Sequence, residues 1–255
     1  MEYLIKMIKS EVRNNIGLIT LNRPEKRNAL NPEMSSLLIE KLKEFAGDTN
    51  IKSVILTGEG TSFCAGADLA WLNKIKDYST VKNEEDTEGV ADLFLALYDF
   101  PKPIIAAVNG PAVGGGCGLA SVCDFVFADT KEARFGYTEV KIGFIPAIVS
   151  IFLIRKIGEG KAKQLLLTGE IVESTKALQL GLVDYLSENV ISDAYIFAEN
   201  LNTNSSFSIS LTKDLIRNIS NMKVHDAVNY CIRLNTISRS SEDFKIGLNK
   251  FLTKN

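Results

Sequence analysis

The chain has 255 residues, a formal net charge of −2 and 24% charged residues. This length suits one large domain, or one domain with a helical appendage. The near-neutral charge balance excludes the extended basic face that nucleic-acid binding requires, so we expect no nucleic-acid partner. We find no apolar run of the roughly 18–20 residues that span a membrane, and we recognise no signal peptide. We therefore expect a cytoplasmic protein without membrane contact.

The cysteines and the single histidine narrow the chemistry further. Cys64, Cys117, Cys123 and Cys231 form no CxxC pair, so we expect reduced and mostly buried thiols. His225 is the only histidine, and no HExxH or GxSxG motif accompanies it. A Ser-His-Asp triad or a histidine-based zinc site would have to include this residue. We expect a half-buried or exposed helical histidine and no bound metal.

The first part of the chain predicts a hairpin, a helix and a strand. Residues 3–9 and 16–22 alternate between apolar and polar and are separated by turn residues, which is typical of a β-hairpin. A polar loop follows at 22–30. Asn31 and Pro32 then indicate a helix start, and the helix should run to about Phe45.

Two turns built from small residues each follow an apolar strand. The strand expected at 53–58 leads to FCAGADL at 63–69, and the strand expected at 104–108 leads to NGPAVGGGCGLASVCD at 109–124. Such turns at helix starts present bare backbone N–H groups to a negative oxygen, although small residues also permit close packing. Two turns of this kind in one chain predict two donors that meet on one carbonyl oxygen, as an enolate-forming enzyme requires.

The rest of the chain predicts an α/β fold followed by a helical part. Residues 76–90 are the most polar stretch, and we expect a mobile loop or a helix rim there. Strand and helix patterns alternate up to residue 186, which favours repeated ββα units. From about residue 190 only helical periodicity remains. The further expected elements are helices at 90–98, 147–157, 161–167, 191–202, 208–219 and 223–238 and a strand at 125–128.

The motifs together resemble the crotonase (enoyl-CoA hydratase/isomerase) superfamily over essentially the whole chain. They are NRPEKRNAL at 22–30, SFCAGADL at 62–69, PKPIIAAVNGPAVGGGCGLASVCD at 101–124, FGYTEVKIGFIPA at 135–147, LLLTGE at 165–170 and a GLVD sequence ending at Asp184. The chain is most similar to the methylglutaconyl-CoA hydratase-type members, through ADLAWL at 67–72 and EVKIGFIPA at 139–147.

This resemblance implies a spiral of ββα turns that acts on an acyl-CoA thioester. Residues 1–189 would form the acyl-CoA-binding core, and residues 190–255 a helical C-terminal oligomerisation part. The resemblance also implies a homotrimer or a dimer of trimers. Coenzyme A would be present as part of the substrate, and no separate cofactor is expected.

The resemblance also assigns roles to individual residues. The oxyanion donors would be the N–H groups of Ala67 and Gly115, and Glu139 would be the catalytic acid/base. We give Asp68 and Asp124 structural roles as well, as caps or partners of backbone N–H groups. Phe251 and Lys254 match positions that reach the ligand, often from a neighbouring subunit. Coenzyme A contacts are implied for Lys26, Arg27, Ala29, Ala65, Gly66, Asp68, Leu69, Gly114 and Gly118.

Gly118 departs from the hydratase pattern, because members with two glutamates have the second one at this position. The two-carboxylate mechanism therefore does not transfer unchanged. Three hypotheses stay open: an enoyl-CoA hydratase for short or branched substrates, an isomerase or other enolate-forming enzyme with one glutamate, and a non-catalytic acyl-CoA-binding protein. The retained turns and Glu139 argue against the third.

Overall fold

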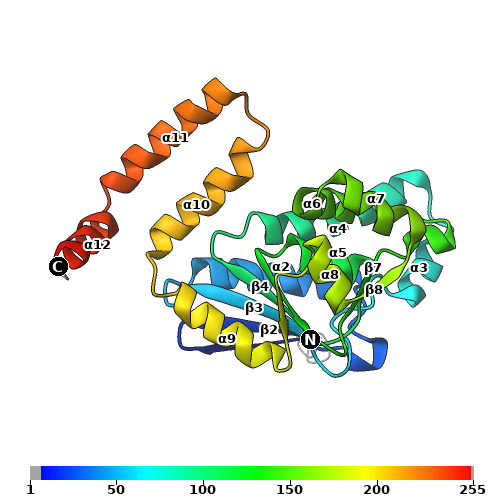
Figure 1. Cartoon of the computed structure of the whole chain (residues 1–255). Coiled ribbons are helices and arrows are strands. Elements are labelled where there is room, and N and C mark those ends of the chain that lie inside the picture. The colour runs from blue at the N-terminus through cyan, green and yellow to red at the C-terminus, as the bar shows by residue number, and fades with distance from the viewer. Residues whose placement is uncertain (1–6, 254–255) are drawn as a thin grey trace.

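The computed structural model describes residues 7–253 and has an α/β architecture with two sheets (Figure 1). The large sheet has six strands in the order β1-β2-β3-β4-β6-β9, and the small sheet has three in the order β5-β7-β8. The large sheet consists of β1 (Ile8–Arg13), β2 (Ile16–Leu21), β3 (Ser53–Gly58), β4 (Ile104–Val108), β6 (Phe125–Asp129) and β9 (Tyr185–Ser187). The small sheet consists of β5 (Ala112–Val113), β7 (Arg134–Gly136) and β8 (Ile171–Glu173).

Helices connect the strands and form the C-terminal part. They are η1 (Pro24–Lys26), α2 (Pro32–Gly47), α3 (Leu69–Ile75), α4 (Thr80–Tyr98), α5 (Gly115–Val122), η2 (Glu139–Ile142), α6 (Ala147–Ile157), α7 (Glu159–Thr168), α8 (Ser174–Leu180), α9 (Val190–Leu201), α10 (Ser206–Ile219), α11 (Val224–Arg239) and α12 (Glu242–Leu252).

The predicted hairpin is present, but its first strand lies later than expected. β1 pairs antiparallel with β2, and the turn consists of Asn14 and Asn15. Both asparagines have positive φ angles of 50° and 63°, a conformation that Asn adopts more readily than most residues. The turn is therefore confined to these two residues, and β1 extends to Arg13. Part of the predicted strand at 3–9 lies outside the described residues.

The central strands of the large sheet are buried on both faces. From β2 onward each neighbouring pair of strands is parallel. Side chains alternate along each strand, so Val54 and Leu56 enter the main core while Ile55 enters a second core. Ala194 and Ala198 of α9 contribute to this second core. This two-sided burial explains why β3 and β4 are continuous apolar runs in the sequence.

The polar stretch at 76–90 is largely helical. The chain forms α4 from Thr80 to Tyr98 without a break, and the Ser79 side chain caps it by accepting from the Lys82 N–H. The loop alternative is therefore wrong for residues 80–90, and the helix-rim alternative is confirmed. The first half of α4 is exposed, whereas Leu93, Phe94 and Leu97 are buried. Its polarity reflects its solvated face rather than a lack of regular structure.

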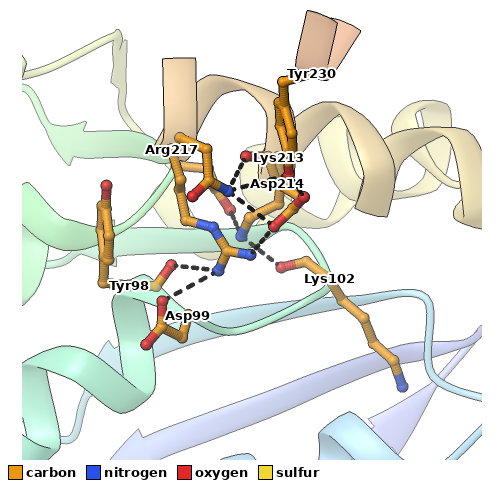
Figure 2. A network of polar contacts seen from close by, with 9 residues as sticks. Tyr98, Asp99, Lys102, Lys213, Asp214, Arg217 and Tyr230 are labelled. Atoms are coloured by element: carbon orange, nitrogen blue, oxygen red, sulfur yellow. Dashed lines mark hydrogen bonds and ion pairs between the residues drawn. The ribbon is translucent and has the colours of Figure 1, made fainter. Parts of the chain in front are cut away.

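The C-terminal helices α10, α11 and α12 extend away from the body that α9 completes (Figure 1). Two basic residues of α10 hold this arm on the body (Figure 2). Lys213 Nζ lies 2.6 Å from Asp124 Oδ2 and 2.8 Å from the Lys102 carbonyl, and Arg217 donates to the Tyr98 carbonyl at 3.2 Å. Helix α12 was not among the predicted elements. The boundary that we place at residue 190 stays a prediction, since α9 itself packs on the sheet.

Candidate active site

The turn that follows β3 leaves one backbone donor free. Leu30 donates to the Gly66 carbonyl at 2.7 Å and accepts from the Asp68 N–H at 2.8 Å. These bonds hold the backbone on both sides of Ala67. Ala67 is exposed, and its N–H donates to no acceptor within residues 7–253. The Ala67 N–H is therefore an unpartnered donor in the part of the chain that the structure describes.

The glycine turn that precedes α5 supplies a second free donor. Gly114 has a φ of +55°, in a region that favours glycine, and its own N–H donates to the Gly136 carbonyl at 2.7 Å. Helix α5 then begins at Gly115. The first N–H groups of a helix have no partner within the helix and lie at its positive end. In the described part of the chain the Gly115 N–H has no acceptor.

The two turns are in direct contact. Val113 donates to the Cys64 carbonyl at 3.0 Å. A Cβ atom added to Gly66 would lie 2.7 Å from the Val113 oxygen and 3.3 Å from the Gly115 nitrogen. Only a residue without a side chain fits there, because both distances are shorter than ordinary contacts. The glycine at 66 therefore lets the backbone segments that carry the two free donors lie side by side.

Glu139 lies against the same glycine turn. Strand β7 pairs with β5, so Gly136 lies opposite Val113 and η2 begins close to Gly114. A Cβ atom added to Gly114 would lie 3.1 Å from Glu139 Oε1. The other oxygen, Oε2, is buried and has no hydrogen-bond partner in the described structure. Burial raises the pKa of Glu139 above its usual value, against a smaller lowering effect of its own backbone N–H.

The loop at 22–30, for which coenzyme A contacts are predicted, is tied to the first turn by hydrogen bonds. Ala65 donates to the Arg27 carbonyl at 2.9 Å, and the Asn28 side chain donates to the carbonyls of Glu59 and Ser62. The side chains of Lys26 and Arg27 are exposed. Among the other predicted contacts, Ala29, Gly66, Asp68, Gly114 and Gly118 are buried, Ala65 is half-buried and Leu69 is exposed.

Comparison with known proteins assigns the chain to a family. A family model described as enoyl-CoA hydratase/isomerase matches residues 11–255. A provisionally named enoyl-CoA hydratase of Thermus thermophilus is 41% identical, over 95% of this chain and 96% of that protein. The 2,3-dehydroadipyl-CoA hydratase of Escherichia coli K12 is 35% identical, over 95% and 94% of the two chains. This protein belongs to the enoyl-CoA hydratase/isomerase family.

The fold agrees with this membership of the crotonase superfamily. The crystal structure of an enoyl-CoA hydratase from Shewanella pealeana matches with a TM-score of 0.94 at 29% identity, covering 100% of this chain and 97% of that one. The predicted crotonase-like architecture is therefore confirmed. The more specific likeness to methylglutaconyl-CoA hydratases stays a prediction.

Gly118 has little space around it in this enoyl-CoA hydratase/isomerase family member. A Cβ atom added to Gly118 would lie 2.4 Å from Val149 Cγ1 and 3.0 Å from Phe94 Cε1. The space beside Gly118, where the resemblance places the second glutamate, is thus filled by apolar side chains from α6 and α4. A ligand contact for Gly118 stays a prediction, and its surroundings argue against one.

The remaining predicted residues lie apart from the two turns. Phe251 is on α12, at the far end of the arm from α5 (Figure 1), and Lys254 lies outside the described residues. Phe251 is therefore not brought to the two turns of its own subunit. His225 is exposed on α11, as expected. Among the residues that the structure describes, no cluster of three or more metal-binding side chains occurs, and no helix is long and apolar enough to cross a membrane.

Three supporting residues escaped the sequence analysis. Arg23 forms an ion pair with Asp68, and the Asn28 side chain is fully buried within loop 22–30. Tyr137 is buried behind α5, where its hydroxyl lies 2.6 Å from Ser121 Oγ. Arg23 and Asn28 stand in the NRPEKRNAL motif, but nothing in that motif alone shows which polar side chains turn inward. The predicted structural roles of Asp68 and Asp124 are confirmed by their bonds to the N–H groups of Ala70 and Ile104.

Proposed function

We propose that this protein adds water across the C2–C3 double bond of an enoyl-CoA thioester. The observation that carries the proposal is the position of three groups around one glycine turn. The free N–H groups of Ala67 and Gly115 belong to backbone segments in contact, and the Glu139 carboxylate, which has one buried and unpartnered oxygen, lies against Gly114. Two donors and one carboxylate are the groups that enolate formation and proton transfer require.

The thioester oxygen would accept hydrogen bonds from Ala67 and Gly115. When a water oxygen bonds to C3, the π electrons of the C2–C3 bond shift toward C1, and the negative charge develops on the thioester oxygen. Donors that are already fixed in place stabilise this charge without reorganising during the reaction. The glycine conformation at 114 keeps the start of α5 open to the substrate.

Glu139 would carry out both proton transfers. Its ionised carboxylate takes a proton from the attacking water, and the resulting carboxylic acid then gives a proton to C2 as the enolate collapses. The net change is the addition of one water molecule, and Glu139 returns to its ionised form. Burial supports this role, because it raises the pKa and so makes the carboxylate a stronger base.

For the substrate we propose a short or branched enoyl-CoA. The relatives include a short-chain-enoyl-CoA hydratase of Clostridium acetobutylicum, 32% identical over 96% of this chain and 94% of that protein. The exposed side chains of Lys26 and Arg27 suit the coenzyme A phosphates, and we expect no cofactor besides the coenzyme A carried by the substrate. A methylglutaconyl-type substrate is the more specific form of this proposal.

A panel of enoyl-CoAs tests the proposal. Hydration removes the absorbance of the conjugated thioester, and the hydroxyacyl-CoA product is identified by mass spectrometry. Isomerisation moves the double bond without adding water, so the mass of the product distinguishes isomerisation from hydration. The relatives are named as hydratases, which does not favour isomerisation. A protein that binds the acyl-CoAs in a thermal shift assay but converts none of them would refute the catalytic proposal.

We also propose a homotrimer or a dimer of trimers that acts in the cytoplasm. Large apolar side chains stand exposed on the arm, including Val224 (76%) on α11 and Phe251 (71%) on α12, and assembly would cover such surfaces. The four cysteines have free thiols, which suits a reducing compartment. Light scattering that finds an active monomer would contradict the assembly.

A further inference from the structure

Gly118 and Val149 form a tight contact on the face of α5 that carries the second donor. Gly118 follows Gly115 by three residues, so the two lie on one face of the helix. The space beside Gly118 is taken, because an added Cβ atom would lie 2.4 Å from Val149 Cγ1 and 2.9 Å from Val149 Cβ. Val149 itself is only 6% exposed.

Aromatic packing holds Val149 in place. Phe152 follows Val149 by one helical turn on α6 and stacks on Phe94 of α4, with ring centroids 5.7 Å apart. Tyr98 also contacts the Phe152 ring, at 5.6 Å between centroids. Phe94 is fully buried and is the second group that an added Cβ at Gly118 would meet. These ring contacts pack α6 against α4 beside Gly118.

The acidic residues that adjoin the two turns are engaged elsewhere. Asp68 binds Arg23 and the Ala70 N–H, and Asp124 binds the Ile104 N–H and Lys213. Both carboxylates therefore have structural partners within the protein. Glu139, by contrast, keeps one buried oxygen without a partner.

We propose that Val149, supported by Phe94, excludes a second carboxylate from position 118 and so limits this enzyme to hydration by Glu139 alone. The inference rests on the proposed function. The steric part concerns Gly118 and Val149 only. The catalytic part is that Glu139 both accepts the proton of the attacking water and delivers a proton to C2, with no second acid taking part.

A stability cycle on the full-length protein tests the steric part without any activity measurement. Alanine has a higher helix propensity than glycine, so Gly118→Ala should stabilise α5 unless the new Cβ atom collides with Val149. We expect the collision to dominate and to lower the Tm by about 2–10 °C. In a Val149→Gly background the same Gly118→Ala change should lower the Tm much less. Glycine is needed at 149, because an alanine there keeps the Cβ atom that would lie 2.9 Å away.

Gly89→Ala is the matched control, because Gly89 also lies within a helix and its added Cβ meets nothing within 4 Å. It should leave the Tm unchanged or raise it. If Gly118→Ala lowers the Tm equally in both backgrounds, or not at all, Val149 does not close this position and the inference is wrong.

A glutamate at 118 tests the catalytic part. We expect Gly118→Glu alone to unfold or to lose hydration of crotonyl-CoA. The double variant Gly118→Glu/Val149→Gly should fold, hydrate crotonyl-CoA at least about tenfold faster than Val149→Gly, and show an additional ionisation in its pH profile of kcat/KM.

A Gly118→Glu protein with the wild-type Tm and pH profile would overturn the inference, as would a double variant that is no more stable than Gly118→Glu. Wild-type protein that hydrates no enoyl-CoA would instead overturn the proposed function, and the stability cycle would still decide the steric part.

Discussion

Arg23 and Asp68 form an ion pair that joins the two loops on which the predicted coenzyme A site depends. Arg23 Nη2 lies 2.8 Å from Asp68 Oδ2, and the two side chains are only 12% and 9% exposed. Arg23 Nη1 also donates to the Ala29 carbonyl, and the other Asp68 oxygen accepts from the Ala70 N–H. The pair thus fixes the residue that directly follows Ala67 to the loop at 22–30.

Loss of either partner of this pair should destabilise the fold. Asp68→Ala leaves the Arg23 guanidinium buried without its counter-charge, and removal of one partner of a buried pair typically costs about 3–5 kcal/mol. Urea unfolding of the full-length protein measures this free energy. Lys9→Ala is the control, because the Lys9–Glu59 pair is exposed and should contribute little. Equal losses for the two variants would contradict the structural role of the Arg23–Asp68 pair.

The same pair should make part of the stability depend on pH. Burial raises the pKa of Asp68, but the hydrogen bonds from Arg23 and the Ala70 N–H outweigh burial and hold it below its usual value of 3.8. A carboxyl group whose pKa is lowered by folding stabilises the protein above its unfolded pKa, and this contribution is lost as the pH falls through the folded value. The stability difference between wild type and Asp68→Asn should therefore shrink below about pH 4. A stability difference between the two proteins that stays constant down to pH 3 would contradict the lowered pKa of Asp68.

Gly115→Pro should remove the second oxyanion donor. Proline is tolerated at the first position of a helix but has no N–H. Loss of one oxyanion donor typically costs about 10²–10³ in kcat. Gly115→Ala is the matched control, because it keeps the N–H and its Cβ would lie an ordinary 3.5 Å from Leu30 Cδ1. We expect near wild-type turnover for the alanine variant. If a folded proline variant had comparable turnover, the Gly115 N–H would not be an oxyanion donor.

Glu139→Gln should abolish proton transfer while acyl-CoA binding persists. The amide keeps the shape of the side chain but does not accept a proton, and general acid–base catalysis typically contributes about 10²–10⁴-fold. Stopped-flow turnover and calorimetric binding separate the two effects. The exposed Glu132 provides the control substitution Glu132→Gln. A loss of less than about tenfold would mean that another group transfers the proton.

The raised pKa of Glu139 also predicts that the same substitution stabilises the protein near neutral pH. A carboxyl group whose pKa is raised by folding binds more protons in the folded state, so stability falls as the pH rises from the unfolded to the folded pKa. Because glutamine does not ionise, Glu139→Gln removes this pH-dependent loss of stability. We expect the variant to be more stable than wild type at pH 7 and equal to it well below the usual pKa of 4.5. Thermal unfolding from about pH 3 to about pH 8 measures the difference.

The sequence predicts the parts of this structure that depend on local pattern. The buried strands β3 and β4 are apolar runs, and the glycine turn at 114–116 is visible by its composition alone. The nearness of Glu139 to Gly114 is not predictable in this way, since it depends on the pairing of β5 with β7, strands of two and three residues. Such short strands carry no periodicity. The resemblance to a known family, rather than local pattern, singled out Glu139.

The surroundings of Gly118 were equally hidden in the sequence. The absence of a glutamate at 118 was visible in the sequence. That Val149 fills the space beside Gly118 was not visible, because the two residues lie on different helices and far apart in the chain. Helix α12 is absent from the predicted elements for a different reason: its apolar residues Phe244, Leu248 and Phe251 do recur at helical spacing, and the prediction simply ended at residue 238.

The contact between Gly118 and Val149 also constrains how this sequence can change over time. A glutamate that arises first at 118 collides with Val149 and is removed through loss of folding. A glycine that arises first at 149 costs some packing but leaves the protein folded, and only then is a carboxylate at 118 accessible. The two substitutions are therefore ordered, and descendants of this sequence would reach a two-carboxylate site by one route and not by its reverse.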